Sequence, residues 1–254
     1  MEQIKAIYIH IPFCNTICSY CDFCKMFYNK SLVDSYLREL ANEIKESYKE
    51  GEIATIYIGG GTPTCLSVEQ LSFLFSLLKD IKLTTNYEFT IEANVDSLTE
   101  EKIKLLKNNR VNRISIGVET FNENYQKMIN RKTSYEALKE KVKLLREHGI
   151  SNINLDLMYG FQNETVDILA KDIDNLLTLA VPHISIYSLI LDEHTKLQLD
   201  NYQRLDEDKD QELYKFIEEK LSNAGYKHYE ISNYAKEGYE SRHNLVYWNN
   251  EEYY

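Results

Sequence analysis

The chain alternates short apolar segments rich in β-branched residues with longer amphipathic segments, and this alternation restricts the possible folds more than any other feature. The apolar segments have the length and composition of buried strands, and the segments between them show helical periodicity. A strand, a loop and a helix repeated in this order predict a parallel sheet with crossover helices. The predicted strands are Ala6–Ile11, Thr55–Ile58, Tyr87–Ala93, Arg113–Val118, Asn152–Leu157 and His183–Leu189.

The predicted helices carry signals at their ends. We expect Ser31 to cap a helix over Leu32–Tyr48 that ends at Gly51. Ser67 and Gln70 have the spacing of a capping box, in which two side chains satisfy backbone donors at a helix N-terminus. The other predicted helices are Ser67–Asp80, Thr99–Asn108, Tyr135–His148, Glu164–Leu179 and Asp206–Asn223.

The strands read as nearly continuous hydrophobic runs, as expected where helices cover the outside of a sheet and side chains fill the inside. This pattern favours an α/β fold with a closed or partial barrel over an open doubly wound sheet. In both architectures, ligands bind at the carboxyl ends of the strands. A chain of 254 residues can form one large domain or two small ones with a sizeable core.

The charge balance argues against a nucleic-acid partner, because 40 acidic and 29 basic residues give a formal charge of -11. No segment approaches the roughly 20 consecutive apolar residues of a membrane span. The start, Met1 to Ile11, reads as a short strand and lacks the charge and cleavage pattern of a signal peptide. We therefore expect a cytoplasmic protein without a membrane span.

Four of the five cysteines fall between Cys14 and Cys24, directly after the first predicted strand. In a reducing cytosol this clustering favours a metal or redox site over disulfides. Cys14, Cys18 and Cys21 form the pattern C-x3-C-x2-C, and soft thiolates are the ligands that iron–sulfur clusters require. Three thiolates on a [4Fe–4S] cluster would leave one iron open. Including Cys24 instead gives a closed four-thiolate zinc or iron–sulfur site.

The segment Gly59-Gly60-Gly61-Thr62-Pro63 follows the second strand, and its glycines allow close approach of the backbone to a ligand. A tight turn alone would need only one glycine. Glu92 ends the third strand, where it is either a site carboxylate or an exposed strand-end residue. Asp156 lies among apolar residues of the fifth strand and must find a partner, because burying an unpaired charge is costly.

The cysteine pattern, with Tyr20 before its last cysteine, resembles the signature of the radical S-adenosylmethionine (SAM) superfamily. This resemblance implies a partial (β/α)6 barrel. It also implies that the open iron binds the amino and carboxylate groups of SAM, and that one electron from the cluster cleaves the sulfonium. Gly60, Gly61 and Thr62 would lie along the methionine amino group. Asp156 would pair with Arg131 or contact ribose hydroxyls.

The order of the sequence blocks resembles the oxygen-independent coproporphyrinogen III oxidases and their relatives over nearly the whole chain. On this resemblance, residues 1–254 form a radical SAM core domain. The family continues past residue 254 with a smaller C-terminal domain, so the aromatic end 247–254 suggests a chain cut in mid-fold. Glu119 stands where the family usually has Gln. The implied cofactor-lining residues are Tyr8, Tyr20, Gly60, Gly61, Thr62, Glu92, Glu119, Arg131, Asp156 and Ile190.

Two features resemble the HemW-type heme chaperones rather than the oxidases. Phe23 stands where the oxidases typically carry a further cysteine, and His243-Asn244-x-x-Tyr247-Trp248 resembles a motif linked to heme binding. His243 would then be an axial ligand of heme, with the aromatic residues stacked on the macrocycle. The alternative is a His243 that only hydrogen-bonds a loop.

The resemblance implies heme or a porphyrinogen as ligand, a one-electron reductant, and a heme-acceptor protein of respiration. Two other functions stay open at this point. One is a coproporphyrinogen III oxidase that converts propionates to vinyl groups by radical decarboxylation. The other is a structural zinc protein that uses Cys14, Cys18, Cys21 and Cys24.

Overall fold

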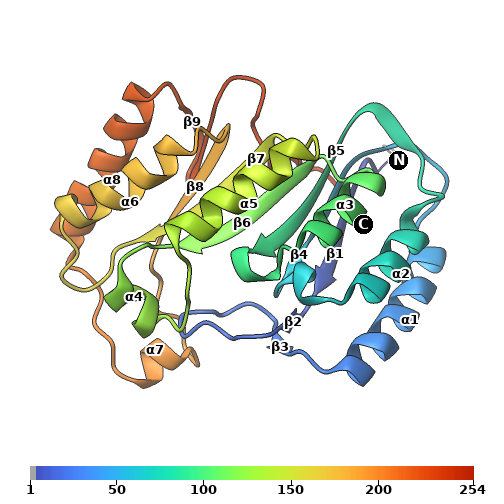
Figure 1. The fold of residues 1–254 in the computed structure, drawn as a ribbon, viewed down its shortest axis with the longest axis horizontal. Coiled ribbons are helices and arrows are strands. Elements are labelled where there is room, and N and C mark those ends of the chain that lie inside the picture. Colours follow the sequence, from blue (N-terminus) through green and yellow to red (C-terminus); the bar gives the residue numbers. More distant parts are fainter. Residues whose placement is uncertain (1–3) are drawn as a thin grey trace.

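A computed structural model describes residues 4–254, and a single large sheet runs through them (Figure 1). Its strand order is β1-β4-β5-β6-β7-β8-β10-β9, in which the first six strands are parallel, β10 runs antiparallel to β8, and β9 runs antiparallel to β10. β1 and β9 form its two edges and do not pair with each other among the described residues, so the sheet does not close into a complete barrel. The strands are β1 (Ala6–Ile11), β4 (Ile53–Gly60), β5 (Leu83–Asn94), β6 (Arg113–Glu119), β7 (Asn152–Tyr159), β8 (His183–Ser188), β9 (Lys227–Glu230) and β10 (Asn233–Ala235).

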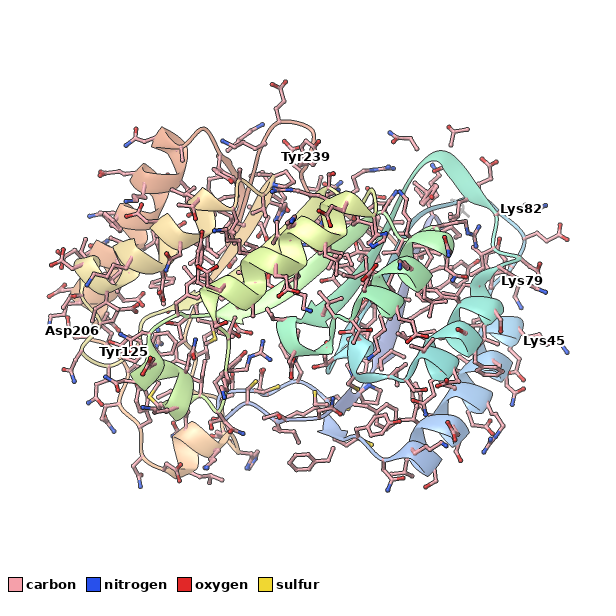
Figure 2. All side chains as sticks on the ribbon, viewed as in Figure 1. Lys45, Lys79, Lys82, Tyr125, Asp206 and Tyr239 are labelled. Atoms are coloured by element: carbon pink, nitrogen blue, oxygen red, sulfur yellow. The ribbon has the colours of Figure 1, made fainter. Side chains whose placement is uncertain are left out.

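Helices connect the parallel strands and cover the outer face of the sheet (Figure 1). Charged side chains such as Lys45, Lys79 and Asp206 project away from this layer (Figure 2). The predicted α/β fold with a parallel sheet is therefore confirmed. The connecting helices are α1 (Lys30–Ser47), α2 (Val68–Leu78), α3 (Glu100–Asn108), α5 (Tyr135–Glu147), α6 (Val166–Thr178) and α8 (Glu207–Asn223).

Several short elements lie outside the predicted rhythm. Helix α4 (Glu123–Met128) follows β6, and α7 (Lys196–Leu199) follows β8. Two-residue strands β2 (Phe13–Cys14) and β3 (Met26–Phe27) pair at the two ends of the cysteine loop. Helix α9 (Arg242–Trp248) lies near the end of the chain. Among residues 4–254, no helix combines the length and the apolar character needed to cross a membrane.

The start of α1 corrects one prediction. Asn29, not Ser31, is the N-cap: its side-chain oxygen accepts the backbone N–H of Leu32 at 3.2 Å, and the helix begins one residue before Ser31. The Ser31 hydroxyl instead donates to the Asn29 side chain at 2.7 Å. The helix ends at Ser47, before Gly51 is reached. The capping box of Ser67 and Gln70 is confirmed at the start of α2.

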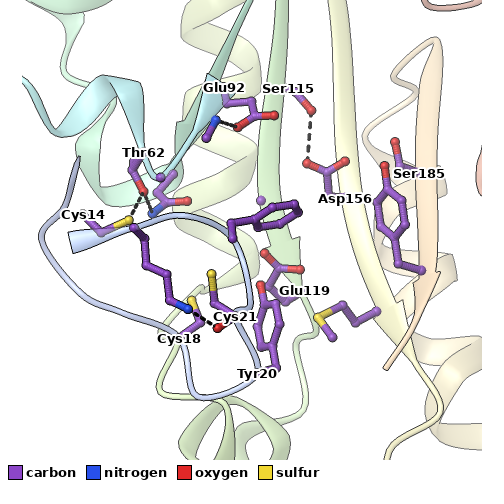
Figure 3. A pocket seen from close by; sticks show the side chains of 18 of the residues that line it. Cys14, Cys18, Tyr20, Cys21, Thr62, Glu92, Ser115, Glu119, Asp156 and Ser185 are labelled. Atoms are coloured by element: carbon purple, nitrogen blue, oxygen red, sulfur yellow. Dashed lines mark hydrogen bonds between the residues drawn. The ribbon is translucent and has the colours of Figure 1, made fainter. Parts of the chain in front are cut away.

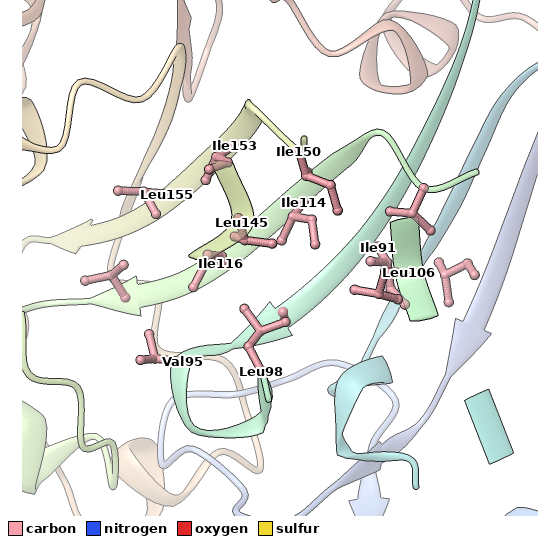
Figure 4. Close-up of a cluster of buried hydrophobic side chains, with 14 of the residues drawn as sticks. Ile91, Val95, Leu98, Leu106, Ile114, Ile116, Leu145, Ile150, Ile153 and Leu155 are labelled. Atoms are coloured by element: carbon pink, nitrogen blue, oxygen red, sulfur yellow. The ribbon is translucent and has the colours of Figure 1, made fainter. Parts of the chain in front are cut away.

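Side chains of the parallel strands alternate strictly, which corrects the expectation of an apolar interior on both faces. The outward residues are apolar and pack under the helices: Ile114 and Ile116 of β6 and Leu155 of β7 meet Leu145 of α5 in the core (Figure 4). The inward residues at the same depth are polar. Because the side-chain period of a strand is two, one sheet presents a hydrophobic face to its helices and a polar lining to its interior.

Candidate cofactor site

A cavity of about 400 Å³ opens at the carboxyl ends of the parallel strands, between these strands and the cysteine loop (Figure 3). This is the end at which α/β barrels bind ligands, and the volume is within the usual range for ligand pockets. Apart from Tyr8 and His243, every predicted site residue lines it. These residues are Cys14, Cys18, Tyr20, Cys21, Gly60, Gly61, Thr62, Glu92, Glu119, Arg131, Asp156 and Ile190.

Backbone hydrogen bonds fix the cysteine loop against the rest of the fold. The N–H of Met26 donates to the Pro12 carbonyl at 2.7 Å, and the N–H of Ser19 donates to the Ile129 carbonyl at 3.0 Å. Cys14 is buried, whereas Cys18 and Cys21 are half-buried along the loop, and all three line the cavity. Cys24 is exposed and lies outside this lining. The loop thus presents three of its four thiols to one space.

The three thiols are in an environment that disfavours free thiolates. Burial raises the pKa of Cys18 to about 12 and also raises the pKa of Cys14 and Cys21. A bound metal compensates such a penalty, because its positive charge stabilises the thiolates. Within residues 4–254, no group of three or more His, Cys, Asp or Glu side chains lies close enough to hold a single metal ion.

The glycine turn, residues 59–63 at the end of β4, brings its backbone unusually close to the cysteine loop. Gly60 has a φ of +112°, and a Cβ there would lie 2.6 Å from the ring of His10. A Cβ on Gly61 would lie 2.8 Å from the Phe13 carbonyl oxygen and 2.9 Å from the Cys14 sulfur. Only glycine fits such contacts. The next residue, Thr62, points its hydroxyl at the Cys14 sulfur at 3.6 Å.

Glu92 is built into the cavity wall, so the alternative of an exposed strand-end residue is wrong. Its Oε1 accepts the Tyr57 hydroxyl at 2.8 Å, and its Oε2 accepts the backbone N–H of Gly60 at 3.0 Å. Burial, reinforced by the nearby Asp156 carboxylate, raises the pKa of Glu92 to about 7. A carboxylate poised in this way can compensate a positively charged ligand.

Asp156 finds one partner on the neighbouring strand β6 and one on its own strand, β7. Its carboxylate accepts the Ser115 hydroxyl at 3.1 Å (Figure 3). It also accepts the Asn154 amide at 2.7 Å. Burial raises its pKa in spite of these hydrogen bonds. Arg131, one of the two partners proposed for Asp156, instead pairs with Glu119 at 3.5 Å and donates to the Gly117 carbonyl at 2.8 Å.

A set of polar residues on the inner faces of the strands was not predicted from the sequence. Arg113 is only 2% exposed, and its Nε has no hydrogen-bond partner among the described residues. These residues could have been found from the alternation of polar and apolar residues within each strand. We expected continuous apolar runs instead. The missed cavity-lining residues on the parallel strands include Tyr57, Arg113, Ser115, Asn154, Ser185 and Tyr187.

His243 and Tyr8 lie outside the cavity lining. The buried ring of His243 forms hydrogen bonds through both nitrogens, to the Thr55 hydroxyl at 2.9 Å and to the Tyr247 hydroxyl at 2.9 Å. Burial lowers its pKa to about 4. A heme iron could bind this ring only if one of these hydrogen bonds were given up. The Tyr8 hydroxyl meets Nδ1 of His10 at 3.0 Å.

Comparison with known proteins supports this picture. The family model of the radical SAM superfamily matches residues 8–176. The heme chaperone HemW of Lactococcus lactis is 41% identical over all of this chain and 68% of its own length. HemW of Bacillus subtilis is also 41% identical, over 99% of this chain and 69% of its own length. HemW of Escherichia coli is 34% identical over 96% of this chain.

Among solved structures, the coproporphyrinogen III oxidase HemN of Escherichia coli superposes with a TM-score of 0.86 over 98% of this chain. It is 23% identical, so this likeness concerns the fold alone, and the chain spans 58% of the oxidase. The cysteine loop, the glycine turn and the parallel sheet thus occur together in a chain that matches a superfamily model and, over nearly all of its own length, about two thirds of several HemW relatives. The chain belongs to the radical SAM superfamily and, within it, to the HemW family.

Proposed function

We propose that this chain binds a [4Fe–4S] cluster through Cys14, Cys18 and Cys21, holds SAM beside it, and acts as a heme-binding protein that delivers heme to a respiratory acceptor. The observation that carries the proposal is the convergence of three thiols, a glycine turn and two strand-borne carboxylates on one cavity. Residues 1–254 would form the radical SAM core domain.

The residues of the cavity fit the proposed cofactors. A cluster held by three thiolates supplies an open iron for the amino and carboxylate groups of SAM and an electron for reductive cleavage. Glu92 would face the positive charge of SAM from the wall of β5. Asp156 would accept ribose hydroxyls, because its carboxylate is already held in place by Ser115 and Asn154. The Gly60–Thr62 backbone would approach the methionine moiety.

Sequence identity favours heme delivery over porphyrinogen oxidation as the function of this chain. The relatives that match nearly all of the chain at 41% identity are heme chaperones, whereas the oxidase resembles it at 23% identity. Phe23 is consistent with this choice, because the oxidases typically carry a cysteine at its position. An anaerobic assay with coproporphyrinogen III and a reductant tests the alternative. Vinyl product would establish the oxidase, and heme titration without turnover supports the chaperone.

The cluster is tested by anaerobic reconstitution of the wild type and of single serine variants. Cys14→Ser, Cys18→Ser and Cys21→Ser should each lower the bound iron and sulfide sharply, whereas the control Cys24→Ser should keep both. Adding SAM to the reduced wild type should change its electron paramagnetic resonance spectrum, because the ligand reaches the open iron. Equal loss in Cys24→Ser would instead indicate a four-thiolate site, and bound zinc without iron would indicate a structural zinc protein.

The proposal also requires partners. A one-electron reductant must supply the cluster, and an acceptor protein must take the heme. An oxygen-sensitive cluster on free cysteines works in a reducing compartment, so we place the protein in the cytoplasm. Pull-down of heme-loaded against heme-free protein would test for a heme-dependent acceptor.

A further inference from the structure

Large apolar side chains stand uncovered at the opening of the cofactor cavity. Phe23 is 63% exposed, Ile190 is 60% exposed and Tyr187 is 42% exposed, yet all three line the cavity. Folded proteins normally bury such side chains or scatter them singly over the surface. Three of them around one opening therefore indicate a surface that receives an apolar ligand.

The three residues come from two separate parts of the fold. Phe23 belongs to the cysteine loop, whereas Tyr187 lies near the end of β8 and Ile190 directly follows that strand. In Figure 3 the cysteine loop and the strand that carries Ser185 stand on opposite sides of the cavity. A ligand in contact with all three would span the opening, above the inner residues that fit SAM.

The chemistry of the opening suits a flat apolar ligand with acidic substituents. Phe23 and Tyr187 offer aromatic rings and Ile190 offers an aliphatic surface, which are the groups that line sites for apolar ligands. Lys25 also lines the cavity and brings a positive charge to a chain with a net charge of -11, and its ammonium donates to the Cys21 carbonyl within the cysteine loop. Asp22 and Asp192 line the cavity too, so a carboxylate is expected on the side of Lys25.

We propose that Phe23, Tyr187 and Ile190 form the contact site for the face of a carboxylated tetrapyrrole, placed across the cavity opening. The identity of the ligand rests on the proposed function, because the heme chaperone assignment supplies the tetrapyrrole. The site itself rests on the exposed side chains. Binding by the face of the macrocycle does not require an iron ligand, and His243 has both ring nitrogens engaged elsewhere.

The test is a titration of the reconstituted full-length protein with heme and, separately, with metal-free protoporphyrin IX. Soret absorbance reports heme, and fluorescence reports the porphyrin. Phe23→Ala and Ile190→Ala should each raise the dissociation constant for both ligands about tenfold, the effect of losing one well-buried apolar contact. Phe27→Ala is the matched control, because Phe27 is 65% exposed close to the same loop but lies outside the cavity lining. Iron content is measured for every variant.

The outcomes separate the site from the function. Weaker binding of both ligands in Phe23→Ala and Ile190→Ala, with an unchanged Phe27→Ala, supports the contact site. Wild-type binding of heme but not of metal-free porphyrin, or unchanged binding in both rim variants, overturns the site and leaves heme binding intact. An equal loss in Phe27→Ala indicates general adsorption and also overturns the site. No heme binding by the wild type refutes the proposed function itself.

Discussion

Replacing Glu92 with Gln should stabilise the protein increasingly as the pH rises. Burial raises the pKa of Glu92 from 4.5 to about 7, and the Asp156 carboxylate adds to the shift. Between these two values the folded chain binds more protons than the unfolded chain, so the stability of the wild type falls as the pH rises through this window. The full difference, 7 − 4.5, corresponds to about 3.5 kcal/mol at about 1.4 kcal/mol for each pKa unit.

The magnitude is best measured as a difference between two pH values. At about pH 5 the folded wild type still carries the proton on Glu92, and at about pH 8 it has lost this proton. The free energy of unfolding of the wild type should therefore be about 2.5 kcal/mol lower at about pH 8 than at about pH 5 through this group alone. The glutamine side chain of the variant has no charge to bury, so the advantage of Glu92→Gln over the wild type should grow by about this amount. Urea unfolding at both pH values gives the two free energies of unfolding.

Glu140→Gln, on the exposed surface of α5, is the control and should follow the wild type at both pH values. Parallel pH profiles for the wild type and Glu92→Gln would refute the reasoning, because they would mean that the Glu92 carboxyl does not titrate near neutral pH in the folded chain. If Glu92 faces SAM as proposed, the same variant should bind SAM about tenfold more weakly or worse, since it would lack the charge opposite the ligand. A gain in stability with a loss in binding is typical of functional sites.

Three further predictions concern the surroundings of the cavity. Gly61→Ala should lower the iron bound after reconstitution while leaving the far-ultraviolet circular dichroism unchanged, because its Cβ would lie 2.8 Å from the Phe13 carbonyl oxygen; full iron content would contradict this. His243→Gln should reduce the loss of stability on acidification, because a pKa of about 4 means that the folded state resists protonation and stability falls as the pH drops below about 6.5. Urea unfolding should show a difference approaching about 3 kcal/mol, and identical acid profiles would be inconsistent with a buried neutral ring. Asp172→Ala should cost about 1–3 kcal/mol of unfolding free energy, because the Thr120 hydroxyl and the Phe121 N–H would lose their buried acceptor; a change below the error of chemical denaturation would show that water replaces it.

The strand–helix alternation was readable from the sequence because each unit carries its own signals. All six parallel strands and their connecting helices were found, since apolar runs and capping residues act within a few positions of each other. The strands β9 and β10 were missed. β9 has the sequence Lys-His-Tyr-Glu, which shows no apolar alternation and becomes a strand only by pairing with β10. Helix α9 is too short to display a helical period.

The candidate site likewise contains features that the local sequence predicts and features that depend on tertiary contacts. The cysteine pattern and the glycine turn are local, and the residues predicted from them line the cavity. Of the two partners of Asp156, Asn154 is local, because it lies two residues earlier on β7. Ser115 reaches the carboxylate only through the register of β6 against β7. The pairing of Arg131 with Glu119 likewise depends on how the chain returns after α4. Sequence spacing could not show whether Arg131 pairs with Asp156 or with Glu119, because both carboxylates follow apolar strand residues.

The surroundings of Glu92 extend further than the cavity lining suggests. Tyr57 donates to the Glu92 carboxylate from one end, while its ring stacks on His243 at a centroid distance of 5.2 Å. Glu88, on the same strand as Glu92, accepts the backbone N–H of His243 at 3.0 Å. Helix α9 therefore meets the cavity side of the barrel directly through Asn244, which lines the cavity, and indirectly through the Tyr57 ring and β5. A displacement of His243, by substitution or by a ligand on its ring, would remove the surface on which Tyr57 rests and so disturb the donor that holds Glu92. For this reason His243→Gln should weaken SAM binding even though His243 does not line the cavity, and unchanged SAM affinity would show that α9 contributes to stability alone.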